Sequence, residues 1–152
     1  ALPLVLLAAT LVVSGCATVE MAPQNSSSKS KEFNAPSQGT AGLYIYRDSW
    51  MGKILKKDIW INGKCLGESG PDVFFYTEVE GGRKHKIETE SEFSPNALEL
   101  MVEPGQKYFI RQYIKLGLVV EGAGLEKVSE AKGRAAIAKL NMAKTCTCSR
   151  PR

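Results

Sequence analysis

The chain has 152 residues, of which 43% are hydrophobic, and a net charge of +4 from 20 basic and 16 acidic side chains. After an apolar leader and a polar stretch are set aside, roughly 110 residues remain, which excludes more than one sizeable domain. The charge surplus is mild and fits attraction to anionic lipid headgroups or cell-wall polymers.

The chain opens with an apolar run without charged side chains, which ends in Val13-Ser14-Gly15-Cys16. An apolar run that ends in small residues is typical of a secretory signal peptide. The alternative is a buried or membrane-spanning helix with an incidental cysteine, but a spanning helix needs about 20 apolar residues and this run is shorter. The run lacks a Met or a basic start, so we expect the precursor to be longer.

These four residues resemble the bacterial lipobox. The resemblance implies a signal peptide over 1–15, cleavage between Gly15 and Cys16, and palmitate-type acylation of Cys16, which becomes the membrane anchor. We expect no other cofactor and no metal. Ala17 follows the cysteine where Asp would imply retention, so the resemblance favours the outer membrane, with the domain facing the periplasm. Export also excludes nucleic acid as a partner.

The next stretch, 16–40, is rich in Ser, Pro, Gln and Asn with almost no apolar periodicity, which predicts the lipidated cysteine followed by a flexible tether. Order is expected to begin at Ala41. Alternating apolar and aromatic residues then predict a series of strands. Their ranges are 41–47, 58–61, 64–68, 72–79, 84–93, 97–103, 107–115 and 117–121.

Turn signals separate these strands about every 8–12 residues, the spacing of a sandwich or small barrel. Asn62-Gly63 is the strongest of them, because a type I′ hairpin turn needs positive φ at both central residues. After Gly124 the period changes, and Ser129 can cap a helix that reaches about Ala143. We therefore predict a mainly antiparallel β-sandwich-like domain over 41–143 with one C-terminal helix, and a frayed tail over 144–152.

The region 41–128 resembles, loosely, bacterial lipoproteins that carry a domain of unknown function. The resemblance is carried by the strand from Leu43 to Arg47, Asn62-Gly63, the segment 82–85 and the Pro104-Gly105 turn. The hairpin portion is also similar to PEGA-type surface modules. The resemblance implies a fold and supplies no catalytic residue.

Four cysteines are present, and acylation of Cys16 would leave an odd number in an oxidising compartment. We consider a disulfide from Cys65 to a cysteine of the tail, with Cys146 as the candidate partner. Three glutamates on one predicted strand face, at positions 88, 90 and 92, are interpreted as a solvated face rather than a cation site.

The best functional lead is a loop that carries Trp50, Met51 and Lys53, because large apolar residues in a basic loop can mark an interaction surface. The alternative is that Trp50 packs over the sheet edge. Tyr44, Tyr46 and Tyr113 could line a ligand groove or pack as the second face of a sheet.

The only histidine, His85, is interpreted as structural because no nucleophile motif accompanies it. The sequence therefore favours a membrane-anchored binding or structural module on the periplasmic side, which meets an envelope protein, a glycan or a lipid. An envelope enzyme with an unrecognised site is the alternative.

Overall fold

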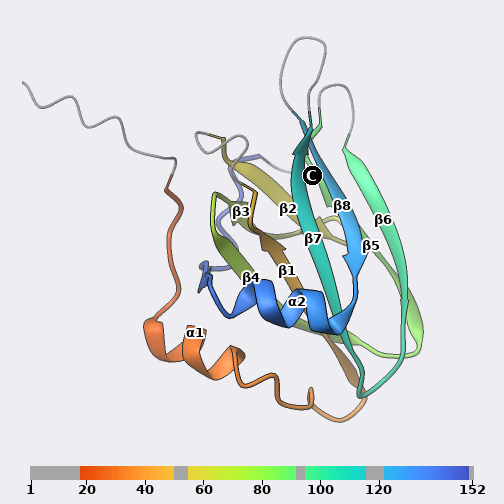
Figure 1. Ribbon diagram of the computed structural model, residues 1–152. Coiled ribbons are helices and arrows are strands. Elements are labelled where there is room, and N and C mark those ends of the chain that lie inside the picture. Colours follow the sequence, from red (N-terminus) through yellow and green to blue (C-terminus); the bar gives the residue numbers. More distant parts are fainter. Residues whose placement is uncertain (1–17, 50–54, 92–94, 116–121, 151–152) are drawn as a thin grey trace, which may run out of the picture.

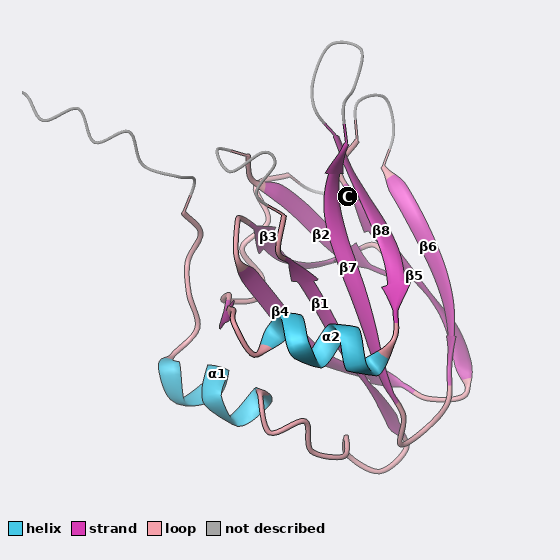
Figure 2. Ribbon diagram, viewed as in Figure 1, coloured by secondary structure: helices cyan, strands magenta, loops and turns pink. Residues whose placement is uncertain are grey.

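The computed structural model describes residues 18–49, 55–91, 95–115 and 122–150. Two β-sheets pack face to face, with strand orders β8-β7-β1-β4-β9 and β3-β2-β5-β6 (Figures 1 and 2). The strands are β1 Thr40–Arg47, β2 Lys57–Ile61, β3 Lys64–Ser69, β4 Val73–Glu80, β5 Arg83–Thr89, β6 Asn96–Val102, β7 Lys107–Lys115, β8 Gly122–Val128 and β9 Asn141–Met142; the helices are α1 Gln24–Ser30 and α2 Glu130–Ile137. The predicted sandwich with a C-terminal helix is confirmed.

Most strand pairs are antiparallel, but two are parallel. Strand β1 pairs with β4 in the antiparallel sense and with β7 in the parallel sense. Strand β9 pairs in parallel with only the first two residues of β4. A parallel neighbour needs a long crossover, and here the chain passes through the whole four-stranded sheet between β1 and β7.

The hairpin between β2 and β3 forms where the sequence predicts it. Asn62 and Gly63 have φ values of 51° and 79°, the left-handed conformation that a type I′ turn requires. The Asn62 side chain adds to the turn, because its Oδ1 accepts from the Lys86 backbone N–H at 2.9 Å.

Two hydrophobic clusters lie on the two faces of the five-stranded sheet. Leu43 and Ile45 of β1 point between the sheets, where they pack with Ile87 and Ile110. The alternate residues of β1 point outward and form a second, aromatic cluster with residues of β4, β7 and α2. Its buried members are Tyr44, Tyr46, Phe74, Phe109, Ile137 and Leu140.

Helix α2 covers part of this aromatic cluster (Figure 1). It begins at the predicted cap, where Ser129 Oγ accepts from the Lys132 backbone N–H at 3.2 Å. It is shorter than expected, because the chain leaves the helix at Ala138 to form β9. Gly133 lets the helix approach the sheet closely, since a Cβ at this position would lie 2.5 Å from the Phe109 Cβ.

The prediction of a flexible tether over 16–40 is wrong for the part that the structure describes. The Ala22 N–H donates to the Met142 carbonyl at 2.9 Å, and α1 follows directly. Phe33 then packs on the aromatic cluster, with its ring centroid 5.3 Å from that of Tyr44. Polar composition suggested disorder, but long-range contacts to β9 and the sheet order this segment.

The prediction of a frayed C-terminal tail is also wrong over 144–150. The tail leaves the five-stranded sheet and crosses to the other one, where the Cys146 N–H donates to the Leu66 carbonyl at 2.8 Å. The buried Asp58 carboxylate accepts from the backbone N–H groups of Ser149 and Arg150 at 3.0 and 2.9 Å. Trp60, two residues after Asp58 on β2, is only 3% exposed.

The disulfide joins Cys65 to Cys148, with 5.9 Å between the two Cα atoms, whereas Cys146 is free and exposed. The choice of Cys146 as partner of Cys65 is therefore corrected. The reason is register: Cys146 lies beside Leu66, and Cys148 reaches Cys65, whose sulfur also accepts from the Cys148 N–H.

We expect Cys148→Ser to lower the free energy of unfolding by about 2–4 kcal/mol, because the bridge closes a long loop in the unfolded chain. The matched change Cys146→Ser, two residues away, should leave the urea midpoint nearly unchanged. Equal losses for the two variants under non-reducing conditions would contradict this pairing.

Candidate functional site

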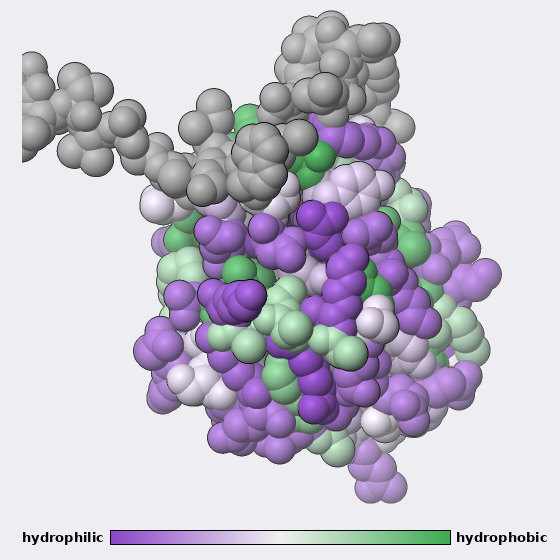
Figure 3. All heavy atoms as spheres, in the orientation of Figure 1, coloured by the Kyte–Doolittle hydropathy of each residue, from purple (hydrophilic) through white to green (hydrophobic). Residues whose placement is uncertain are grey.

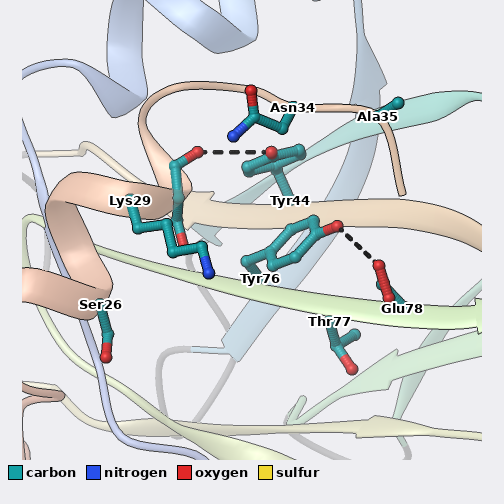
Figure 4. Close-up of a pocket in the computed structure, with 9 residues that line it drawn as sticks. Ser26, Lys29, Asn34, Ala35, Tyr44, Tyr76, Thr77 and Glu78 are labelled. Atoms are coloured by element: carbon teal, nitrogen blue, oxygen red, sulfur yellow. Dashed lines mark hydrogen bonds between the residues drawn. The ribbon is translucent and has the colours of Figure 1, made fainter. Parts of the chain in front are cut away.

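A hollow lies between helix α1 and strands β1 and β4 on the outer side of the five-stranded sheet (Figure 4). Its volume is about 510 Å³. We call it the α1 hollow. Its principal lining residues are Ser26, Lys29, Asn34, Tyr44, Tyr76 and Glu78.

The floor of the α1 hollow is aromatic. The ring of Tyr44 stacks on Phe109, with centroids 4.9 Å apart, and meets Tyr76 on its other side at 4.6 Å. Gly42 makes room for Tyr76, because a Cβ there would lie 3.1 Å from the Tyr76 ring. Such ring arrangements stabilise the cluster beyond simple burial.

Burial also changes the ionisation of these phenols. It raises the pKa of Tyr44 to about 12, and the neighbouring Tyr76 contributes to the rise. The pKa of Tyr76 is raised as well, mainly by burial and then by the Glu78 carboxylate. Both phenols therefore remain protonated hydrogen-bond donors at neutral pH.

The rim of the α1 hollow carries opposite charges. The Glu78 carboxylate accepts from the Ser37 N–H at 2.8 Å and from the Ser37 hydroxyl, and the Tyr76 hydroxyl donates to it at 3.4 Å. Lys29 extends from α1 toward Tyr76 in Figure 4. The exposed face around α1 and α2 is mostly hydrophilic with small apolar patches (Figure 3).

A second hollow, of about 470 Å³, lies on the other side of β4, toward β2 and β3. We call it the β3 hollow. Ile61, Leu66 and Val79 give it an apolar part, and Lys64 and Arg83 stand at its rim. Thr77 and Glu78 line both hollows, so the two hollows flank the same edge of β4.

His85 lies beside the β3 hollow but is 3% exposed, and the fold uses both of its ring nitrogens. The Glu80 carbonyl can only accept, so Nε2 donates to it, at 2.7 Å. Nδ1 then accepts from the Asn62 side-chain amide at 2.8 Å. His85 thus joins the turn before β3 to the turn before β5.

Of the predicted site residues, Gly15, Cys16, Trp50, Met51 and Lys53 lie outside the described residues. The signal peptide, the anchor and the interaction loop therefore stay predictions.

The three tyrosines considered either for a ligand groove or for the second face of a sheet have different surroundings in the structure. Tyr44 lines the α1 hollow, Tyr46 is buried in the aromatic cluster, and the Tyr113 ring packs over Gly124. In its described part, the predicted solvated face of glutamates is also not formed. Glu88 is buried rather than solvated, and Glu90 accepts from the Asp58 N–H at 2.8 Å.

Sequence reasoning missed Lys29 and Tyr76 as site residues. Tyr76 falls in the predicted strand 72–79, whose consecutive aromatic residues Phe74, Phe75 and Tyr76 indicate side chains on both faces and give no sign of a hollow above it. Lys29 lies in a Ser-rich segment with low helix propensity. The available signal was Phe33, a large apolar residue inside an otherwise polar stretch.

In the described ranges, no group of three or more His, Cys, Asp or Glu side chains is placed to hold a metal ion. Nor does any helix in these ranges have the length and apolarity needed to cross a bilayer.

The fold and its two hollows define a small β-sandwich domain, on which the described segments before β1 and after α2 are packed. Comparison with known proteins shows that the chain belongs to the family described as Protein of unknown function (DUF2846), whose model matches residues 37–124. An uncharacterized protein of Haemophilus influenzae is 56% identical over 133 residues, which cover 88% of this chain and 79% of that protein. No solved structure matches the chain.

The raised pKa of Tyr44 predicts a loss of stability at high pH. An unfolded tyrosine ionises near pH 10, whereas folded Tyr44 holds its proton to about pH 12. The contribution of Tyr44 to the free energy of unfolding is therefore complete below pH 10. It falls by roughly 2–3 kcal/mol as the pH rises toward 12. Urea unfolding of wild type and Tyr44→Phe is measured between pH 9 and 12. The free energy of unfolding should fall less steeply with pH for the variant than for the wild type. Parallel curves would contradict the assignment.

Proposed function

We propose that the protein is a lipid-anchored binding module of the bacterial envelope, held by acylated Cys16 at the outer membrane and facing the periplasm. The observation that carries the binding role is the course of the N-terminal segment. The segment that follows Cys16 packs on the sheet, turns into α1 and forms one wall of the α1 hollow. The same stretch of chain thus links the proposed anchor to the candidate site.

The distance between anchor and domain is short in this proposal. Packing begins at Val19, which lies against the hydrophobic cluster between the sheets. The Glu20 carbonyl then accepts from the Lys144 N–H at 2.9 Å, and Met21 forms a bridge with Ala143. Cys16 precedes Val19 by three residues, which span at most about 11 Å. A partner of this domain would therefore be met close to the membrane surface.

The anchor is tested by Cys16→Ala in the full precursor, with labelled palmitate and membrane fractionation. We expect the variant to lose the label and the tight membrane association, because a thioether-linked lipid needs the thiol and stable anchoring needs more than one acyl chain. The matched control Cys146→Ala, at a free exposed cysteine, should keep both. Label and fractionation like wild type in Cys16→Ala would place the anchor elsewhere.

The short distance between the proposed lipid anchor and the domain is tested by photo-crosslinking in cells. Met21 and Met101 are the exposed large hydrophobic residues of the described chain, at 45% and 52% exposure. Met21 adjoins the anchor, whereas Met101 lies on β6, across the molecule from α1 (Figure 1). Benzoylphenylalanine at position 21 should give phospholipid adducts several-fold more often than at position 101. Equal yields would show that the domain stands away from the bilayer.

A further inference from the structure

One edge of the five-stranded sheet is only partly covered. Strand β9 pairs with Val73 and Phe74 alone, although β4 continues to Glu80. Beyond these pairs, the described residues place no strand against this edge. An edge strand offers backbone N–H and C=O groups to any chain that can lie alongside it.

The register shows which backbone groups face this edge. The Phe74 carbonyl accepts from the Ala143 N–H at 2.8 Å, so Phe74 points its backbone groups away from β1. In an antiparallel pair this direction recurs at every second residue, which places Tyr76 and Glu78 on the same side. The Gly42 N–H, opposite Glu78, donates toward Gln106 rather than toward β4, in agreement with this register.

The unpaired part of the edge ends before Glu80, because the Glu80 carbonyl already accepts a hydrogen bond from Nε2 of His85. The free stretch is therefore Tyr76 to Glu78. Within the described chain, no hydrogen bond involves the backbone N–H or C=O of Tyr76 or Glu78 on this side.

The two hollows lie on either side of this stretch. The α1 hollow opens on the outer side of the sheet and the β3 hollow on the inner side, and Thr77 and Glu78 line both. Side chains of an added strand alternate between the two sides of the sheet. Successive side chains would therefore enter the two hollows in turn, which is the geometry of strand addition with alternate pockets.

The charges along the edge favour acidic side chains. The Glu80 carboxylate is paired with the Arg83 guanidinium at 3.2 Å. The Glu78 carboxylate keeps its charge but is held by the neutral Ser37 N–H and hydroxyl, so two lysines face one unpaired carboxylate along this edge. Lys29 lines the α1 hollow and Lys64 lines the β3 hollow, and the structure pairs neither ammonium group with a described carboxylate. One cation thus faces each side of the edge.

We propose that an extended acidic peptide segment of an envelope partner binds as an added strand along Tyr76–Glu78, with successive carboxylates reaching Lys29 and Lys64. The main chain of the peptide exchanges hydrogen bonds with Tyr76 and Glu78, which a glycan or a lipid chain cannot do in this register. The inference deepens the proposed binding role and rests on it, because it names the partner of the same site.

The test uses the full-length protein purified from membranes in detergent. The probe is a synthetic nine-residue peptide of valine and threonine with a central Glu-Asp pair. We expect saturable chemical-shift changes at Tyr76 and Glu78 and at least tenfold slower amide hydrogen exchange at both. The same peptide N-methylated at alternate amides should bind at least tenfold more weakly. Equal binding of the two peptides, or no binding at millimolar peptide, would overturn the proposal.

Variants separate the backbone contribution from the charges. Glu78→Pro removes an N–H that points away from β1 and should bind at least tenfold more weakly than Glu78→Ala. Lys29→Glu and Lys64→Glu should each weaken binding severalfold, whereas Lys84→Glu, on the exposed side of β5, should not. If Glu78→Pro does not fold, the N-methylated peptide decides the backbone question.

Two further results have defined meanings. Self-association through this edge in the absence of peptide, seen as protection of Tyr76 and Glu78 that depends on protein concentration, would assign the edge to a second copy and overturn the proposal. Peptide binding by a protein that incorporates no palmitate would support the proposal for the edge while removing the lipid anchor. The two proposals therefore fail separately.

Discussion

Strand β1 is buried on both faces, and much of the architecture follows from this constraint. Leu43 and Ile45 lie between the sheets, while Tyr44 and Tyr46 lie under the outer covering. A two-layer sandwich would leave the outer aromatic face in water. Because burial of aromatic rings is a large favourable contribution, the chain adds a third layer, made of α2 on one part of the face and the segment around Phe33 on another.

The described N-terminal segment and the described C-terminal segment contact each other beside β9. The N-terminal segment bridges to β9 through Met21 and Ala143, and Glu20 pairs with Lys144 at 3.8 Å. From Lys144 the chain crosses to the four-stranded sheet, where the Cys65–Cys148 disulfide and Asp58 hold it. The segment that carries α1 and the disulfide-bound tail are thus joined to each other through β9 and its neighbouring residues.

Chains of hydrogen bonds between the sheets satisfy several buried polar groups of the interior. The Gln112 amide from β7 donates to Thr89 of β5 at 2.8 Å and accepts from Ser69 of β3, and Thr89 in turn donates to the Asp58 carbonyl. Buried polar groups are costly without partners. The free backbone groups at Tyr76 and Glu78 lie at the surface, where water can satisfy them until a partner does, which is the condition that strand addition requires.

The sequence by itself determined most of the sheet, because period-two alternation and turn residues such as Asn62-Gly63 act over a few neighbouring residues. It also predicted the cap at Ser129, again a local interaction. It failed for α1, the tail and the partner of Cys65, since these depend on contacts between residues that are far apart in the chain: Ala22 with Met142, Asp58 with Arg150, Cys65 with Cys148. The hollows and the free edge of β4 have the same origin. Each of them lies where a packed helix or strand ends against the sheet. Only the tertiary structure decides where that end falls.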